Sequence, residues 1–171
     1  MTMMNLVQSI NLALKQEMER DETVILLGED VGRDGGVFRV TEGLWQQFGD
    51  NRVIDTPLAE VGIIATSIGL AIAGMKPIPE VQFDGFSIPM LDQIYNHAGR
   101  MRKRSQGKYH VPLTFRIPHG GGIRALEHHS ESLEAFFTHI PGIKVVTPSG
   151  PYNAKGLLVS SIRDPDPVIF L

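Results

Sequence analysis

The first apolar positions of the chain recur at the spacing of an amphipathic helix. These positions are Met3, Leu6, Val7, Ile10, Leu14 and Met18. Positions three or four residues apart lie on one face of a helix, so this pattern predicts a helix that buries one side. The segment 23–27 follows, which is apolar after Thr23, and it predicts a short buried strand. We therefore expect the chain to begin with a helix that leads into a strand.

Predicted strands and helices continue to alternate as far as the last residue. Strand-like apolar segments occupy 23–27, 52–55, 77–83, 111–117, 143–147 and 168–171. Helical patterns occupy 42–48, a stretch beginning at Glu60, 88–104, 130–138 and 152–162. Parallel strands need long crossover connections, which are usually helices. The pattern predicts an α/β fold with a doubly wound, mostly parallel sheet of about six strands covered by helices on both faces.

Composition narrows the classes of protein that the chain can belong to. A length of 171 residues suits one domain, and 42% hydrophobic with 20% charged residues is ordinary for a globular chain. No apolar run reaches the ~18 residues of a membrane span. A net charge of −3 gives no electrostatic footprint for nucleic acid. The absence of cysteine excludes disulfides and thiolate catalysis. No secretory signal begins the sequence, so we expect a cytoplasmic protein, or one of the mitochondrial matrix if a transit peptide has been removed.

Three segments follow predicted strands and carry polar or aromatic residues: 55–60, 83–86 and 118–130. The carboxyl ends of parallel strands meet at one edge of a sheet, where ligands of such folds usually bind. We therefore expect these segments to converge on one pocket.

Glu60 is the most informative residue of this edge. It is the only charged residue between Thr56 and Met75, and its neighbours are apolar or small. Desolvation favours the neutral acid, so such a carboxyl can hold a proton near neutral pH and donate it. Alternatively, a Glu in the first turn of a helix only complements the helix dipole, which contributes about 0.3–1 kcal/mol. The residue pattern by itself leaves both interpretations open.

Other candidate motifs carry less information. One of the adjacent His128 and His129 is a candidate proton carrier, but no third residue stands at the spacing of a zinc site. Phe86 follows a predicted strand and is either part of the core or a face for a planar ring. The glycines 120–122 lack the lysine of a phosphate-binding loop, which favours a simple turn. No nucleophile elbow of a hydrolase is present.

Eight segments taken together resemble one family: 28–31, 35–38, 52–60, 80–83, 91–93, 120–122, 129–130 and 141–146. Over essentially the whole chain, 1–171, they are similar to the N-terminal, pyrimidine-binding domain of the E1 β subunit of 2-oxo acid dehydrogenase complexes, of the pyruvate or branched-chain type. This transketolase-like family uses thiamine diphosphate. The family's C-terminal domain is expected to be absent from this chain.

The resemblance implies a role for individual residues. Glu60 matches the glutamate that hydrogen-bonds the aminopyrimidine ring of the cofactor and promotes the imino tautomer that deprotonates the thiazolium carbon. Phe86 matches the aromatic residue that packs on this ring, while Glu29 and Leu58 match positions that line it. His129, rather than its neighbour, matches the histidine near the reacting carbon that handles the substrate and the acyl group.

The resemblance also implies metal ions. Some members of the family hold potassium through backbone carbonyls, at positions that match Leu113, Ser161, Ile162, Asp164 and Asp166. The chain lacks the Gly-Asp-Gly and distant Asn that hold magnesium and the diphosphate, so an α subunit is expected to supply that half of the site. Pro89 stands where some relatives carry a polar residue near the pyrimidine.

The expected function follows from the same resemblance. The chain would be the β-subunit part of an E1 enzyme that decarboxylates a 2-oxo acid and acylates the lipoyl groups of the E2 acyltransferase, active only with an E1 α partner in an α2β2 assembly. One alternative is an acetoin-cleaving or split transketolase-like subunit that uses the same cofactor. An alternative of another class is a catalytically silent scaffold or regulatory α/β subunit. The sequence does not choose between pyruvate and a branched-chain 2-oxo acid.

Overall fold

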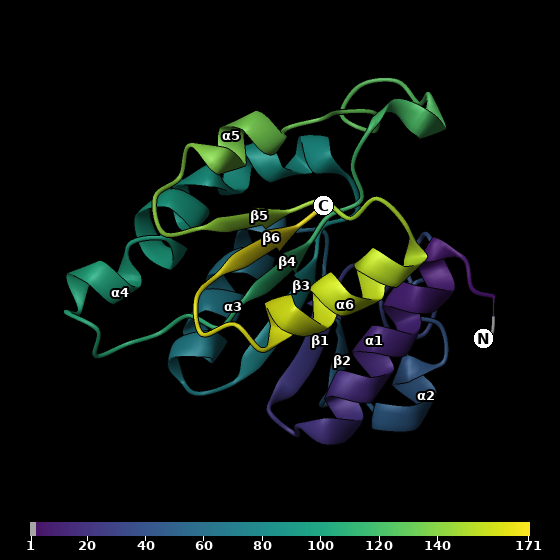
Figure 1. Cartoon of the computed structure of the whole chain (residues 1–171), viewed down its shortest axis with the longest axis horizontal. Helices are drawn as coiled ribbons and strands as arrows, with labels where there is room; N and C mark the ends of the chain where they lie inside the picture. The colour runs from purple at the N-terminus through teal and green to yellow at the C-terminus, as the bar shows by residue number, and fades with distance from the viewer. Residues whose placement is uncertain (1–2) are drawn as a thin grey trace.

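A sheet of six parallel strands forms the centre of the computed structural model, which describes residues 3–171 (Figure 1). The strands are β1 (Val24–Gly28), β2 (Val53–Asp55), β3 (Lys76–Glu80), β4 (Thr114–Arg116), β5 (Lys144–Val146) and β6 (Val168–Phe170). Their order in the sheet is β2-β1-β3-β4-β6-β5. The predicted α/β class, the mostly parallel sheet and all six strand positions are therefore confirmed.

Helices cover both faces of this sheet. The α-helices are α1 (Leu6–Arg20), α2 (Leu44–Phe48), α3 (Glu60–Ile72), α4 (Met101–Arg104), α5 (Glu134–Thr138) and α6 (Pro151–Ile162). Two 3-10 segments, η1 (Asp84–Met90) and η3 (Gly121–Ile123), and one π-helical segment, η2 (Gln93–Ala98), complete the chain. In Figure 1, α1 and α6 lie side by side in front of the sheet, whereas α3 lies behind it. Within the described part of the chain, no helix is long and apolar enough to cross a membrane.

Two hydrophobic layers, one on each face, hold the helices to the sheet. Leu14 of α1 and Leu158 of α6 pack in one layer together with Phe170 of β6. Ile64 of α3 packs in the other layer against Phe115 of β4. All five side chains are at most 2% exposed, and burial of each such side chain contributes about 1.5–3 kcal/mol. The apolar positions that recur at helical spacing in the sequence are thus the ones that pack against the two faces of the sheet.

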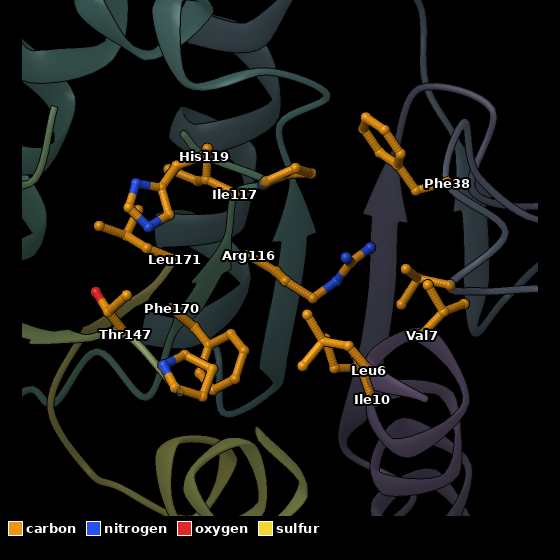
Figure 2. Close-up of a pocket in the computed structure, with 13 residues that line it drawn as sticks. Leu6, Val7, Ile10, Phe38, Arg116, Ile117, His119, Thr147, Phe170 and Leu171 are labelled. Atoms are coloured by element: carbon orange, nitrogen blue, oxygen red, sulfur yellow. The ribbon is translucent and has the colours of Figure 1, made fainter. Parts of the chain in front are cut away.

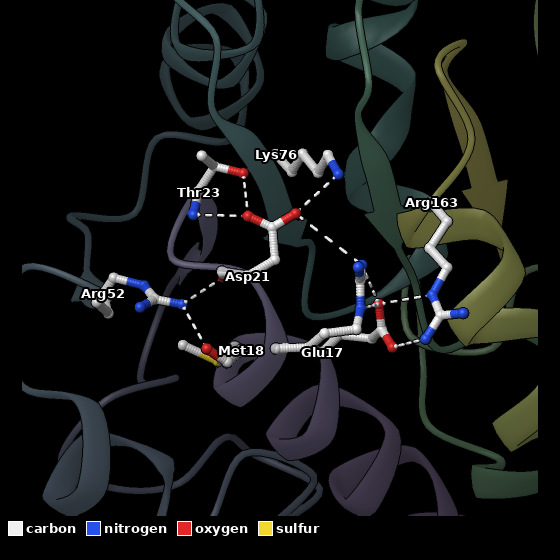
Figure 3. A network of polar contacts seen from close by, with 8 residues as sticks. Glu17, Met18, Asp21, Thr23, Arg52, Lys76 and Arg163 are labelled. Atoms are coloured by element: carbon white, nitrogen blue, oxygen red, sulfur yellow. Dashed lines mark hydrogen bonds and ion pairs between the residues drawn. The ribbon is translucent and has the colours of Figure 1, made fainter.

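A polar network ties α1 to the amino edge of the sheet (Figure 3). Glu17 is 2% exposed, and it accepts hydrogen bonds from Arg163 at 2.6 Å and from Arg20 at 2.8 Å. Burial raises the pKa of Glu17, but the hydrogen bonds from the two arginines outweigh burial and hold the pKa below its ordinary value. Asp21 accepts a hydrogen bond from Lys76 at 2.8 Å, and this contact is the main reason for its lowered pKa. These charges are paired, as burial requires.

Two predicted helices differ from those observed. The stretch predicted as helical at 88–104 is mostly helical but is not one regular α-helix, because it contains the end of η1, then η2 and α4. Pro89 lies inside η1, and a proline lacks the N–H that a regular helix needs. The helix expected from 130 begins only at Glu134. The residues before it form a loop in which the N–H of Leu133 is used by a side chain outside the helix.

Candidate functional site

The order of the strands creates a switch point at the carboxyl edge of the sheet. β2 pairs with one side of β1 and β3 pairs with the other, so the connections from this region diverge in opposite directions. Ligands of open α/β sheets bind outside such a point. Glu29 directly follows β1, and Glu60 begins α3 shortly after β2. The N–H of Thr56 donates to the carbonyl of Gly28 at 2.9 Å, so the two strand ends are adjacent.

Glu29 is a buried carboxyl at this switch point. It is 8% exposed, and its Oε1 has no hydrogen-bond partner among the described residues. Burial raises the pKa of Glu29, and the negative charges of Glu60 and then Asp30 raise it further, whereas an N–H from Ala59 opposes them. The negative charge of Glu60 is therefore close enough to act on Glu29. A buried, unpartnered acid in such a place is typical of functional sites.

Asp55 fixes the loop that carries Glu29. Its two carboxylate oxygens accept hydrogen bonds from the N–H groups of Gly32, at 2.6 Å, and Arg33, at 3.2 Å. A Cβ on Gly32 would lie 2.6 Å from this carboxylate, so the contact requires glycine. Sequence reasoning placed Asp55 only at a strand end. The sequence signal for this role was a single acidic residue, Asp55, at the end of an otherwise apolar strand.

Glu60 is less buried than its apolar neighbourhood predicts. It is half-buried, because the side of α3 that carries Gly62, Ala65 and Gly69 is exposed in this chain. The opposite side of α3, with Ile64, is fully buried. This chain's own residues therefore exclude water from only part of the Glu60 side chain, whereas the sequence predicted a fully desolvated carboxyl.

Three aromatic rings from the segments that follow β1 and β3 pack together. The rings of Phe83 and Phe86 lie 5.9 Å apart, edge to face, and Phe38 lies 5.6 Å from Phe83. The imidazole of His129 lies 4.4 Å from Phe83 and 5.1 Å from Phe86, measured between centroids. These contacts confirm that the segments 83–86 and 118–130 converge at the carboxyl edge of the sheet.

The backbone defines the orientation of the His129 ring. Its Nδ1 lies 2.6 Å from the carbonyl oxygen of Glu127 and 3.1 Å from that of Leu126. A carbonyl oxygen can only accept, so Nδ1 must carry the proton of these hydrogen bonds. Nε2 is then the nitrogen available to a reacting group. Its neighbour His128 is exposed, with its ring centroid 6.1 Å from that of Phe86.

The remaining predicted residues lie apart from this centre or are exposed. Leu58, in the loop before α3, is 79% exposed. The positions matched to a potassium site lie in three places: Leu113 directly precedes β4, Ser161 and Ile162 end α6, and Asp164 and Asp166 lie in the connection from α6 to β6. The N–H of Val168 donates to the carbonyl of Leu113 at 2.8 Å, which brings the two segments together at the amino edge of the sheet. Among residues 3–171, no group of three or more His, Cys, Asp and Glu could hold a metal ion.

A hollow of about 340 Å³ lies next to the site, at the carboxyl ends of β4 and β6 (Figure 2). It is mostly apolar, and the side chain of Arg116 extends into it. Arg116 is 3% exposed and pairs with the buried Glu80 of β3, while burial lowers the pKa of Arg116 to about 10. Neither Glu60 nor His129 lines this hollow. The ion pair was missed in the sequence, since no local pattern shows that two strand ends will be neighbours.

The arrangement suits a flat, nitrogen-containing ring. A buried carboxyl such as Glu29, which favours retention of its proton, can exchange a hydrogen bond with a ring nitrogen, and aromatic side chains can pack against the ring faces. The imidazole of His129 packs against two of these rings, and its Nδ1 is held by the backbone. These features define a candidate ligand-binding site at the carboxyl edge of an α/β sheet.

Comparison with known proteins identifies the family. Residues 2–171 match the model of the transketolase pyrimidine-binding domain, and the chain belongs to this family. It is 57% identical, over 171 residues, to the pyruvate dehydrogenase E1 component subunit beta of Acholeplasma laidlawii, covering 100% of this chain and 52% of the relative. It is 52% identical, over 170 residues, to the 2-oxoisovalerate dehydrogenase subunit beta of Bacillus subtilis (strain 168), covering 99% of this chain and 52% of the relative. The chain thus spans about half the length of these relatives.

A solved structure supports the fold. The chain superimposes on a split-gene transketolase, described as an inactive β4 tetramer, with a TM-score of 0.76. The match covers 98% of this chain and 50% of the other, at 15% sequence identity. At this identity the similarity concerns the fold alone.

Proposed function

We propose that this chain is the pyrimidine-binding part of a thiamine diphosphate-dependent 2-oxo acid dehydrogenase E1 β subunit. The observation that carries the proposal is the buried Glu29 oxygen without a partner, next to Glu60 at the switch point of the sheet. Two relatives of more than 50% identity, named for pyruvate and for 2-oxoisovalerate dehydrogenases, support this class of substrate. The names of these relatives leave both 2-oxo acids as candidate substrates.

The residues present fit the aminopyrimidine ring of this cofactor. Glu60 would hold a proton at a ring nitrogen, and Glu29 would keep that proton shared by disfavouring a second negative charge nearby. Phe86 would pack on the ring, with Leu58 at its margin. Bound thiamine diphosphate supplies the thiazolium carbon and the electron sink for decarboxylation. His129, through its free Nε2, would exchange a proton with the substrate or the acyl group that leaves for lipoyl.

A partner is proposed to complete the site. The 171 residues contain no Gly-Asp-Gly and distant Asn pattern, so an E1 α subunit would supply magnesium and the diphosphate contacts. The exposed side of α3 next to Glu60 supports an assembly in which that subunit covers it. The E2 lipoyl acyltransferase would accept the acyl group. Potassium would bind at the amino edge, remote from the reaction, where Leu113 meets the α6–β6 connection.

Replacement of Glu60 by Gln in the assembled enzyme tests the proposal. The substitution preserves size but removes the exchangeable carboxyl proton, so hydrogen–deuterium exchange at the thiazolium C2 should slow in parallel with turnover. General acid–base contributions of about 10²–10⁴-fold set the expected scale. His129→Ala is the matched control, because it should leave this exchange largely intact and slow acyl transfer. A Glu60→Gln enzyme that assembles and exchanges C2 at the parent rate would disprove the role of Glu60.

A further inference from the structure

The loop that carries His129 has little regular structure of its own. Between β4 and α5 only η3 is helical, and three residues other than glycine have positive φ: Arg124 at 55°, Glu127 at 25° and His128 at 66°. Side chains disfavour this region of backbone space, so such residues persist only where surrounding contacts hold them. Glu127 and His128 directly precede the histidine, and the carbonyl of Glu127 binds its Nδ1. The orientation of His129 therefore depends on contacts outside the loop.

Two of these contacts come from adjacent residues after β3. The N–H of Gly85 donates to the carbonyl of His128 at 3.2 Å. The Oδ2 of Asp84 accepts from the N–H of Leu133 at 2.8 Å. Asp84 is 2% exposed, and this bond lies in a buried environment. One contact holds the residue before His129 and the other holds the end of the loop, so together they fix the intervening segment.

Position 85 requires a glycine because the backbone of His128 approaches it closely. Its own φ is not in the left-handed region, but a Cβ at this position would lie 2.5 Å from both the Cα and the carbonyl oxygen of His128. A side chain here would push the loop away from the sheet. The hydrogen bond and the lack of a side chain therefore act together to bring the His128 backbone onto the turn.

The same turn also supplies the aromatic contacts of the imidazole. Phe83 and Phe86, which flank the two anchoring residues, pack against the His129 ring at 4.4 Å and 5.1 Å. We propose that Asp84 and Gly85 are positioning residues that hold His129 with Nδ1 on the Glu127 carbonyl and Nε2 open toward the cofactor half-site. This inference rests on the proposed role of His129.

The N–H of Leu133 can only donate, so the Oδ2 of Asp84 acts as an acceptor. Burial raises the pKa of Asp84 above its ordinary value and Glu134 adds to this, whereas the Leu133 N–H, His119 and Ser87 oppose the rise. The hydroxyl of Ser87 bonds the backbone carbonyl of Asp84 at 2.6 Å and lies 3.5 Å from Oδ1. An asparagine at position 84 retains an oxygen that can accept from Leu133, whereas alanine does not. Asp84→Asn is therefore the conservative variant that separates anchoring from the loss of a buried side chain.

The first experiment measures the loop in this chain without cofactor. Asp84→Ala should speed amide hydrogen exchange in the 120–133 segment by about tenfold, the effect of losing one buried hydrogen bond. Nitrogen NMR of the imidazole should show Nδ1–H in the parent and a mixture with Nε2–H in Asp84→Ala, with Asp84→Asn restoring the parent signals. Asp55→Ala, which removes the equivalent anchor of the Gly32 loop, should affect only that loop. Unchanged exchange and an unchanged tautomer in Asp84→Ala would overturn the proposal.

The second experiment uses the assembled enzyme. Asp84→Ala and Gly85→Ala should slow acyl transfer to lipoyl as His129→Ala does, while C2 exchange stays near the parent rate. If His129→Ala impairs transfer and both anchor variants do not, the anchoring inference is wrong. If His129→Ala has no effect, the proposed role of His129 fails, and the exchange and tautomer measurements still decide whether the anchors position it. Gly85→Ala, which keeps the Asp84 carboxylate, decides both experiments if Asp84→Ala does not fold.

Discussion

Glu29 lies at the proposed half-site, in an environment that disfavours its ionised carboxylate. Its buried carboxyl has an oxygen without a partner, and burial and the charge of Glu60 raise its pKa above the ordinary value of 4.5. A carboxyl with a raised pKa in the folded state binds its proton more tightly there than in the unfolded chain. Its contribution to stability is therefore fully present below pH 4.5 and is lost as the pH rises through the pKa of the folded state.

We expect Glu29→Gln to stabilise this chain at pH 7, because the variant no longer has to bury a negative charge. The gain should disappear near pH 4, where the parent carboxyl is protonated in both states. Thermal unfolding at the two pH values measures this difference. Glu42→Gln, at an exposed position, is the control and should change little at either pH. A Glu29→Gln variant less stable than the parent at pH 7 would show that the ionised carboxyl is favourable where it lies.

At the scale of elements, α3 has two unlike faces. Ile63, Ile64 and Ile68 are buried against the sheet and its neighbouring segments. The opposite face carries Gly62, Ala65 and Gly69, all exposed, and small residues allow another backbone to approach closely. Since this face begins beside Glu60, we expect it to be covered when the site is complete.

Ala65→Glu tests this expectation for α3. The side chain is exposed, so the free energy of unfolding should change by no more than about 0.5 kcal/mol. A charge on a closely packed interface should, however, prevent association of the variant with the α subunit. We also expect the parent chain to self-associate at micromolar concentration through this face, and the variant should self-associate less. Sedimentation across a concentration series measures both. Asn153→Glu, an exposed position on α6, is the control and should associate like the parent. Normal assembly of Ala65→Glu would rule out this face as the contact.

At the scale of the whole molecule, the chain holds one half of the proposed site. The switch point brings together segments that follow β1, β2, β3 and β4, with aromatic and acidic side chains for a planar ring. Residues for the diphosphate are expected on the partner. Most of the charge-dense contacts of such a cofactor would therefore lie outside this chain.

The chain alone should bind thiamine diphosphate weakly or not measurably, because the pyrimidine contacts cannot replace those to the diphosphate and magnesium. Calorimetric titration with and without magnesium measures the affinity, and addition of the α subunit should restore it. Micromolar, magnesium-dependent binding to the chain alone would contradict the division of the site between two subunits.

Local patterns in the sequence were enough for the class of fold. Each strand and most helices are marked by apolar spacing that depends only on neighbours along the chain, as in α1 and in β6 (Val168–Phe170). The alternation of strands and helices implied a parallel sheet. A parallel sheet in turn implies one edge where the carboxyl ends of the strands converge. The roles expected for Glu60 and His129 came from resemblance to a family, since no local pattern distinguishes a catalytic residue from a capping or core residue.

Only the tertiary structure decided the contacts between distant segments. It determined that β6 lies between β4 and β5, that Arg116 pairs with Glu80, and that Glu60 is half-buried in this chain. It also divided the predicted 88–104 helix into 3-10, π and α segments and joined Asp84 to Leu133 across 49 positions of sequence. Apolar spacing reports which side of an element is buried. It carries no information on which other element will cover that side, because this depends on how all the layers pack together.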